Sequence, residues 1–226
     1  MSSPLIEVRD LRKSYSIDHA VINVLKGINE VFNAGEITAI MGPSGVGKTT
    51  LLNILGALDR QTSGEIFFQG KPYSKMDEQE FAHFRNQTIG FVFQFHHLLG
   101  EFTALENVMI PQLIAGVNKT DASAKARTAL IEMGLQDRVE HKPSEMSGGE
   151  QQRVAVARSL INDPRLVLAD EPSGNLDKAS GEMLTTILWN LCQEKGHGFI
   201  IVTHNQKLAD KADRQILISD GSIVQE

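Results

Sequence analysis

The sequence predicts an α/β fold whose core of parallel strands is interrupted by a helical region. Short apolar runs at residues 36–41, 166–170 and 199–203 have the form of parallel strands that are buried on both faces. A glycine-rich segment follows the first run and leads into residues 49–58, which favour a helix. Few strand-like runs occur between residues 95 and 161, where helix-forming segments dominate.

The remaining strand candidates lie before the helical region. Residues 5–8 and 21–32 mix β-branched and polar side chains with some alternation, as in strands that face solvent on one side. Residues 64–70 are bounded by glycines, and residues 90–94 begin with one, so both are predicted to be short strands.

Capping residues in the sequence indicate where helices begin and end within the helical region. Thr103 and Ser147 are each followed three residues later by glutamate, which is the form of a capping box at a helix N-terminus. Residues 121–133 are rich in alanine, and Gly134 follows them as a predicted helix C-cap.

One domain accounts for the length of 226 residues, since domains average about 150 residues and no long linker or repeat divides the chain. Residues 179–193 supply a crossover helix between the last two buried strands. We therefore predict a single domain over residues 5–226. Its core comprises residues 5–94 and 162–226, and residues 95–161 form a helical subdomain.

Composition excludes several classes of protein. Hydrophobic residues make up 41% and charged residues 22%, as in ordinary globular proteins. The net charge of -6 disfavours a nucleic-acid partner. Apolar runs fall short of the roughly 18 residues that cross a bilayer, and residues 1–7 do not have the form of a secretory signal. The single cysteine, Cys192, excludes an internal disulfide and fits a reducing cytoplasm.

The glycine-rich segment fits the phosphate-binding pattern G-x-x-x-x-G-K-[ST] between a strand and a helix. Glycines let backbone N–H groups converge on phosphate oxygens, and the helix N-terminus adds a favourable field. Lys48 is expected to hold the β- and γ-phosphates, and Thr49 to ligate Mg²⁺. The predicted ATP-binding residues of this loop are Gly42, Pro43, Ser44, Gly45, Val46, Gly47, Lys48, Thr49 and Thr50.

Two carboxylates end the buried strand at residues 166–170. Asp170 is predicted to be a second Mg²⁺ ligand, because such an enzyme needs a carboxylate at the end of a neighbouring strand. Glu171 follows it, in a position to polarise the water that attacks the γ-phosphorus. The alternative for this acidic pair is a solvated strand end that caps the next helix.

A further motif, at residues 147–153, resembles that of a known family. Residues 147–153, Ser-Gly-Gly-Glu-Gln-Gln-Arg, resemble the signature motif of ATP-binding cassette (ABC) ATPases, with Glu150 where many members carry glutamine. Two glycines at a helix start expose backbone donors to an anion. Glu150 is also expected to cap the backbone of Ser147, as in an ordinary capping box.

This resemblance implies a RecA-like P-loop core with an antiparallel β subdomain and an inserted helical subdomain. It implies a head-to-tail homodimer that sandwiches ATP, with Ser147, Gly148, Gly149 and Glu150 facing the partner's P-loop. Further roles follow by position. Tyr15 would stack on adenine, Gln94 would reach Mg²⁺ and the attacking water, Asp177 would lie where the subunits sense each other, and His204 would contact the γ-phosphate. The implied catalytic residues are Glu171, His204, Gln94 and Lys48, and the implied metal ligands are Thr49, Gln94 and Asp170.

Residues 95–108 and 166–177 resemble the ATPase branch of lipoprotein-releasing transporters. That branch implies coupling of ATP hydrolysis to transport at the cytoplasmic face of a bacterial inner membrane, with two multispanning subunits docked near residues 95–108. Macrolide-export and cell-division complexes of the same family, and non-transport ABC ATPases, remain alternatives. Phe95, Leu98, Leu99 and Phe102 alternatively pack the helical region onto the core.

Overall fold

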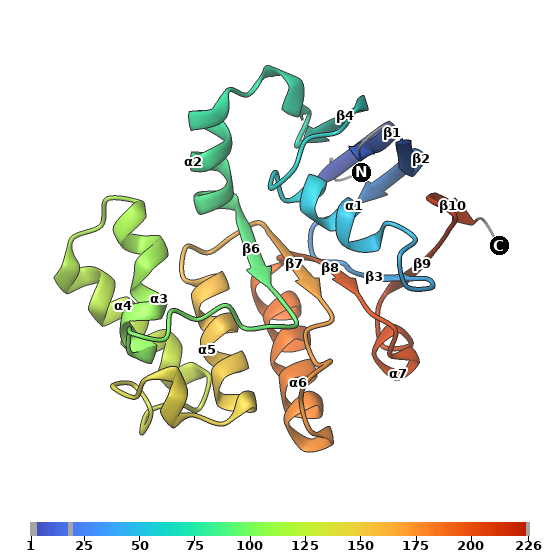
Figure 1. Ribbon diagram of the computed structural model, residues 1–226. Coiled ribbons are helices and arrows are strands. Elements are labelled where there is room, and N and C mark those ends of the chain that lie inside the picture. Colours follow the sequence, from blue (N-terminus) through green and yellow to red (C-terminus); the bar gives the residue numbers. More distant parts are fainter. Residues whose placement is uncertain (1–3, 18–19, 225–226) are drawn as a thin grey trace.

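The structure is a computed structural model that describes residues 4–17 and 20–224. Within these residues the larger sheet has six strands in the order β10-β9-β3-β8-β7-β6 (Figure 1). All neighbouring pairs are parallel except β10 and β9. The six strands are β3 (Ile37–Met41), β6 (Ile89–Val92), β7 (Leu166–Asp170), β8 (Gly198–Val202), β9 (Arg214–Ser219) and β10 (Ser222–Val224).

The central strands of this sheet are buried on both faces. Successive side chains of a strand point to opposite faces, so Val167 and Ala169 of β7 join one apolar core while Leu166 and Leu168 join the other. Every residue of β8 is buried. The apolar runs that predicted parallel strands are therefore confirmed.

Helices cover both faces. Helix α1 (Lys48–Leu55) packs in the core with Leu168, whereas α6 (Lys178–Lys195) packs in the core with Val167. The short helix α7 (Gln206–Ala209) follows β8. The helix predicted over residues 49–58 was too long: α1 ends at Leu55, because Ala57 takes a left-handed conformation with φ of 55°.

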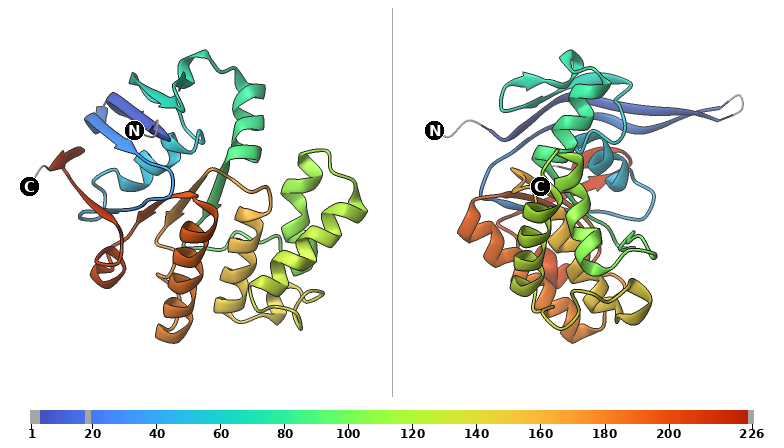
Figure 2. Two further views of the ribbon diagram at one scale, coloured as in Figure 1. Left: turned by 180° about the vertical axis from the view of Figure 1, so that it is seen from behind. Right: turned by 90° about the vertical axis from the view of Figure 1, so that its left-hand side faces the viewer.

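The smaller sheet is antiparallel and has the order β2-β1-β4-β5. Its strands β1 and β2 form a ribbon that extends to one side of the molecule (Figure 2, right). The strand predicted over residues 5–8 continues to Ile17. Asp10 (φ of 44°) interrupts the regular pairing there, and after the buried Leu11 the residues up to Ser16 are polar or aromatic, so the hydrophobic pattern stops early. The strands are β1 (Ile6–Ile17), β2 (Ala20–Phe32), β4 (Ser63–Phe68) and β5 (Lys71–Pro72).

The helical region lies beside the larger sheet (Figure 1) and begins after β6. The predicted capping boxes at Thr103 and Ser147 are both confirmed, each with the expected glutamate. Gly134 follows its helix with a positive φ of 68°, as predicted for a C-terminal glycine. The three helices are α3 (Ala104–Ile114), α4 (Lys119–Glu132) and α5 (Gly148–Leu160).

Helix α2 (Glu78–Thr88) was not predicted. It connects the smaller sheet to β6 and buries only Phe81 fully, so it lacks a strong apolar periodicity. Its capping box, formed by Asp77 and Glu80, was a signal that would have located its start. No helix among the described residues is long and apolar enough to cross a bilayer.

Candidate functional site

The glycine-rich loop lies between β3 and α1. Gly42 and Gly47 have φ of 146° and 101°, and a Cβ atom on Gly42 would lie 2.2 Å from the carbonyl oxygen of Ile218. Lys48 reaches back over the loop and donates hydrogen bonds of 2.8 Å to the carbonyls of Gly42 and Pro43. The loop thus combines a closely packed backbone, a helix N-terminus and a lysine ammonium, which together suit a phosphate chain.

Thr49 and Asp170 meet next to this loop. The Thr49 hydroxyl donates to Asp170 Oδ2 at 2.8 Å. Burial raises the pKa of Asp170, and the neighbouring charge of Glu171 raises it further. A cation beside this carboxylate would favour its ionised form. Hydroxyl and carboxylate oxygens are also the donors that Mg²⁺ prefers, so the pair fits such an ion.

Glu171 lies at the same strand end. Its backbone has a positive φ of 46°, a conformation that residues other than glycine rarely adopt. Its amide donates to the carbonyl of Val202 on the adjacent strand. One carboxylate oxygen lies 2.7 Å from Nδ1 of His204, and the other accepts from Thr203 Oγ1 at 3.2 Å. The side chain of Glu171 is 15% exposed, so these contacts orient a largely buried carboxylate.

Gln94 and Asn175 join two loops at this edge. The side-chain amide of Gln94 donates to Asn175 Oδ1 at 3.3 Å, and the amide of Asn175 donates to the Gln94 carbonyl at 3.1 Å. Gln152 of α5 links the same two loops at a second point. Its buried amide donates to the carbonyls of Phe93 at 3.2 Å and Pro172 at 2.9 Å. The contacts of Gln152 were not predicted.

The strand ends and the glycine-rich loop surround one cleft of about 540 Å³. It brings together most of the residues predicted to bind phosphate, metal or the attacking water. The cleft is lined by Val24, Gly42, Ser44, Gly45, Gly47, Lys48, Thr49, Thr50, Gln94, Asp170, Glu171, Val202 and His204.

Other predicted site residues lie outside this cleft. Tyr15 is on β1, 38% exposed, and its hydroxyl donates to Asp59 at 2.7 Å. Asp177 caps α6 by accepting a hydrogen bond from the backbone of Ser180. The roles predicted for Tyr15 and Asp177 involve a bound base and a second subunit, so they stay predictions.

The signature segment begins α5, which packs in the opposite core from α1. Glu150 accepts from the Ser147 amide at 2.7 Å, so the expected cap is confirmed. This bond lowers the pKa of Glu150, and Arg138, 2.8 Å away, lowers it further. Gly148 is exposed, and a Cβ atom there would meet nothing within 4 Å, so the helix start is open to solvent.

A strand, a phosphate-binding loop, a helix and carboxylates at the next strand end together define a P-loop nucleoside triphosphatase. The family described as "ABC transporter" matches residues 25–174. The chain belongs to this family, as the signature segment predicted, and it is an ABC-type ATPase. The predicted fold class is likewise confirmed.

Proteins of known sequence and structure resemble the chain over nearly its full length. The lipoprotein-releasing system ATP-binding protein LolD of Geobacter metallireducens is 52% identical, covering 98% of this chain and 99% of the relative. LolD of Porphyromonas gingivalis is also 52% identical, covering 98% and 100%. The solved dimer of MJ0796, a bacterial ABC transporter cassette, has a TM-score of 0.90 and 38% identity, covering 97% of each chain. A post-hydrolysis dimer of MJ0796 with ADP and Pi also has a TM-score of 0.90, with 37% identity over 97% of each chain.

Proposed function

We propose that this chain is the ATP-hydrolysing subunit of a transporter that releases lipoproteins from a bacterial inner membrane toward the outer membrane. The observation that carries this proposal is 52% identity, across 98% of the chain, to proteins named LolD. The subunit acts at the cytoplasmic face as a homodimer, bound to two multispanning subunits that resemble LolC and LolE. Closure of the dimer on ATP drives extraction, and substrate choice lies in the membrane subunits.

In this proposal the cleft binds the ATP phosphates. Lys48 exchanges its two bonds to neutral loop carbonyls for stronger bonds to the negatively charged β- and γ-phosphates. Glu171 accepts the proton of the attacking water, and His204, which lies against Glu171, contacts the γ-phosphate. Gln94 orients that water from the opposite loop.

Thr49, Asp170 and Gln94 would hold Mg²⁺, which when bound supplies positive charge to the phosphate oxygens. The raised pKa of Asp170 supports this assignment, because the buried carboxylate favours a nearby cation. Tyr15 stacks on the adenine base at the far side of the phosphate loop.

The start of α5 completes the site of a second copy. Ser147, Gly148, Gly149 and Glu150 reach the γ-phosphate held by the partner's loop, and Asp177 faces the partner. The position of the start of α5 supports this contact with a second copy. The open start of α5 does not line the cleft of its own subunit, so it is available to another. Residues 95–161 act in this assembly as a helical subdomain beside the core.

Membrane subunits dock on the loop of residues 95–102, here named the docking loop. Phe95, Leu99 and Phe102 are 66%, 47% and 42% exposed, while Leu98 packs against the core. Arg158 donates bonds of 2.8 Å to the carbonyls of both histidines in the loop and so holds its shape. Beside it lies a hollow of about 410 Å³, whose lining includes Phe91, Phe93 and Ile114.

The function is tested by purifying the chain in complex with the two membrane proteins proposed to bind it, and by reconstituting this complex in liposomes. We expect ATP-dependent release of a lipidated protein to a soluble acceptor. Copurification with ribosomes or DNA, without membrane proteins, would refute the proposal.

The docking loop has its own test. We expect Phe95→Ala to reduce lipoprotein release per ATP hydrolysed, with ATP affinity changed less than about twofold. Ile131→Ala removes a similarly exposed apolar side chain from α4, 51% exposed, and serves as the matched control. An equal loss of ATP affinity in the Phe95 variant would instead support a packing role.

A further inference from the structure

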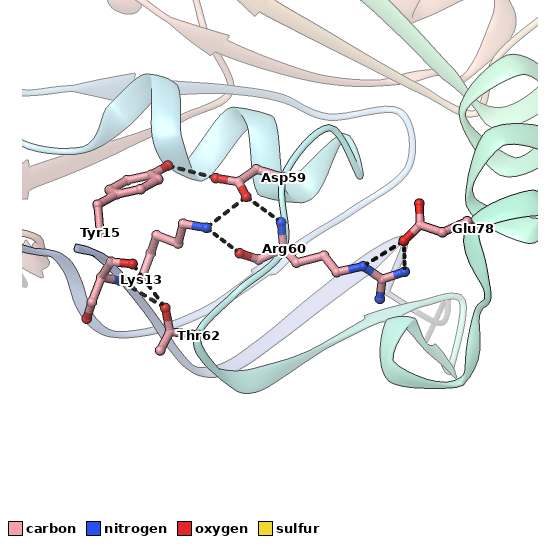
Figure 3. Close-up of polar contacts among 7 residues, drawn as sticks. Lys13, Tyr15, Asp59, Arg60, Thr62 and Glu78 are labelled. Carbon is pink, nitrogen blue, oxygen red and sulfur yellow. Dashed lines mark hydrogen bonds and ion pairs between the residues drawn. The ribbon is translucent and has the colours of Figure 1, made fainter. Parts of the chain in front are cut away.

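Asp59 connects two residues of β1 to the end of the phosphate-loop helix. Its Oδ1 accepts from the Lys13 ammonium at 2.7 Å, and its Oδ2 accepts from the Tyr15 hydroxyl at 2.7 Å (Figure 3). Asp59 lies just beyond the C-terminal end of α1, whose first residue is Lys48. One short element therefore connects the phosphate loop with the carboxylate that holds Tyr15.

The lysine end of this bridge is buried, whereas Asp59 and Tyr15 are partly exposed. The side chain of Lys13 is only 11% exposed, and its ammonium also donates to the carbonyl of Arg60 at 2.7 Å. The same ammonium lies 4.6 Å from the centroid of the Tyr15 ring. The backbone amide of Arg60 donates to Asp59 Oδ1 at 2.7 Å. Lys13 and Arg60 thus fix the carboxylate, and the carboxylate fixes the phenol.

The ionisation states favour this arrangement at neutral pH. Partial burial opposes ionisation of Asp59, but the hydrogen bonds from Lys13 and Tyr15 lower its pKa overall. Burial and the bond to Asp59 raise the pKa of the Tyr15 phenol. The phenol stays protonated and donates to a carboxylate that stays ionised.

We propose that Asp59 is a positioning residue that holds the Tyr15 ring in place for stacking on the nucleotide base. The inference rests on the base contact assigned to Tyr15 in the proposed function. Aromatic stacking requires a defined ring position, and Tyr15 is 38% exposed on a strand that extends away from the core. With Asp59 anchored at the end of α1, the ring keeps a fixed distance from the phosphate loop at the start of α1.

Calorimetric titration of the full chain with AMP-PNP and with inorganic tripolyphosphate tests the role, because tripolyphosphate has no base. We expect Asp59→Ala and Tyr15→Phe each to weaken AMP-PNP binding about fivefold, the worth of one hydrogen bond. Binding of tripolyphosphate should change less than about twofold. The double variant should be no weaker than either single variant, because both remove the same contact.

Glu78→Gln is the matched control, since it breaks the exposed Arg60–Glu78 pair of the same network without touching Tyr15. It should leave binding of both probes unchanged. Tyr15→Phe keeps the Lys13–Asp59 pair, so it carries the test even if Asp59→Ala fails to fold.

Three outcomes would overturn the positioning role. The first is unchanged AMP-PNP affinity in Tyr15→Phe together with a clear loss in Tyr15→Ala. The second is equal weakening of AMP-PNP and tripolyphosphate, which indicates general damage to the fold. The third is unchanged affinity in Tyr15→Ala, in which case the base contact of the proposed function is itself wrong.

Discussion

We expect the replacement of Glu171 with glutamine to block ATP hydrolysis while ATP binding is retained. The amide is nearly the same size as the carboxylate, and its oxygen still accepts the hydrogen bond that His204 now gives at 2.7 Å. Its nitrogen cannot accept a proton from water or a bond from Thr203, which lies 3.2 Å from the second carboxylate oxygen. The variant therefore keeps the shape of the cleft and loses the proposed base.

A positioned general base contributes about 10²–10⁴-fold in rate, or roughly 3–5 kcal/mol of barrier. We expect kcat for ATP to fall by a factor in this range, measured with the membrane partners present. ATP affinity should be retained or increased, because the neutral amide no longer repels the negatively charged γ-phosphate in the same cleft. Gel filtration in ATP should show an accumulated dimer.

Glu132→Gln makes the same chemical change at an exposed position near the end of α4, and it should leave turnover unchanged. Near-normal hydrolysis by Glu171→Gln would refute the assignment of Glu171 as the base. A parallel loss of ATP binding would instead show that the carboxylate maintains the cleft.

Four further predictions follow from individual contacts. Gly42→Ala should abolish ATP binding in a titration, because its Cβ atom would lie 2.2 Å from the Ile218 carbonyl oxygen. Arg158→Gln should lower transport per ATP without changing ATP affinity, since it frees the carbonyls of the docking loop. Gln152→Leu should reduce the free energy of unfolding in urea by about 2–3 kcal/mol, because one buried and one partly buried carbonyl lose their donor. Burial raises the pKa of the Cys192 thiol to about 11, so iodoacetamide at pH 8 should label it only after unfolding.

The parts of the site that the sequence predicts are those formed by consecutive residues. Lys48 and Thr49 belong to a loop whose spacing alone specifies its chemistry, and Asp170 and Glu171 end an apolar run that has to be a buried strand. The roles of Tyr15 and Ser147 came instead from the resemblance to a family. Their physical basis involves a second molecule or a nucleotide, which no pattern within one chain encodes.

Contacts between distant segments were not predictable. Lys13 and Tyr15 are 46 and 44 residues from Asp59, and no periodicity links a polar strand end to the residue beyond a helix. Gln152 looks like any polar residue of a helix until its neighbours from two other loops are known. Such contacts depend on tertiary packing, which local propensity and spacing do not specify.

Helix α5 connects three parts of the molecule that the proposed function requires to move together. Ser147 caps its start at the predicted dimer contact, Gln152 holds the segments that carry Gln94 and Glu171, and Arg158 holds the docking loop near its end. At 1.5 Å per residue, its 13 residues span about 20 Å. Because a capped helix with a buried face moves as one body, we expect a displacement of its start by the nucleotide of the proposed dimer to displace the docking loop as well. In the proposed complex, the membrane subunits would therefore sense the bound nucleotide through α5.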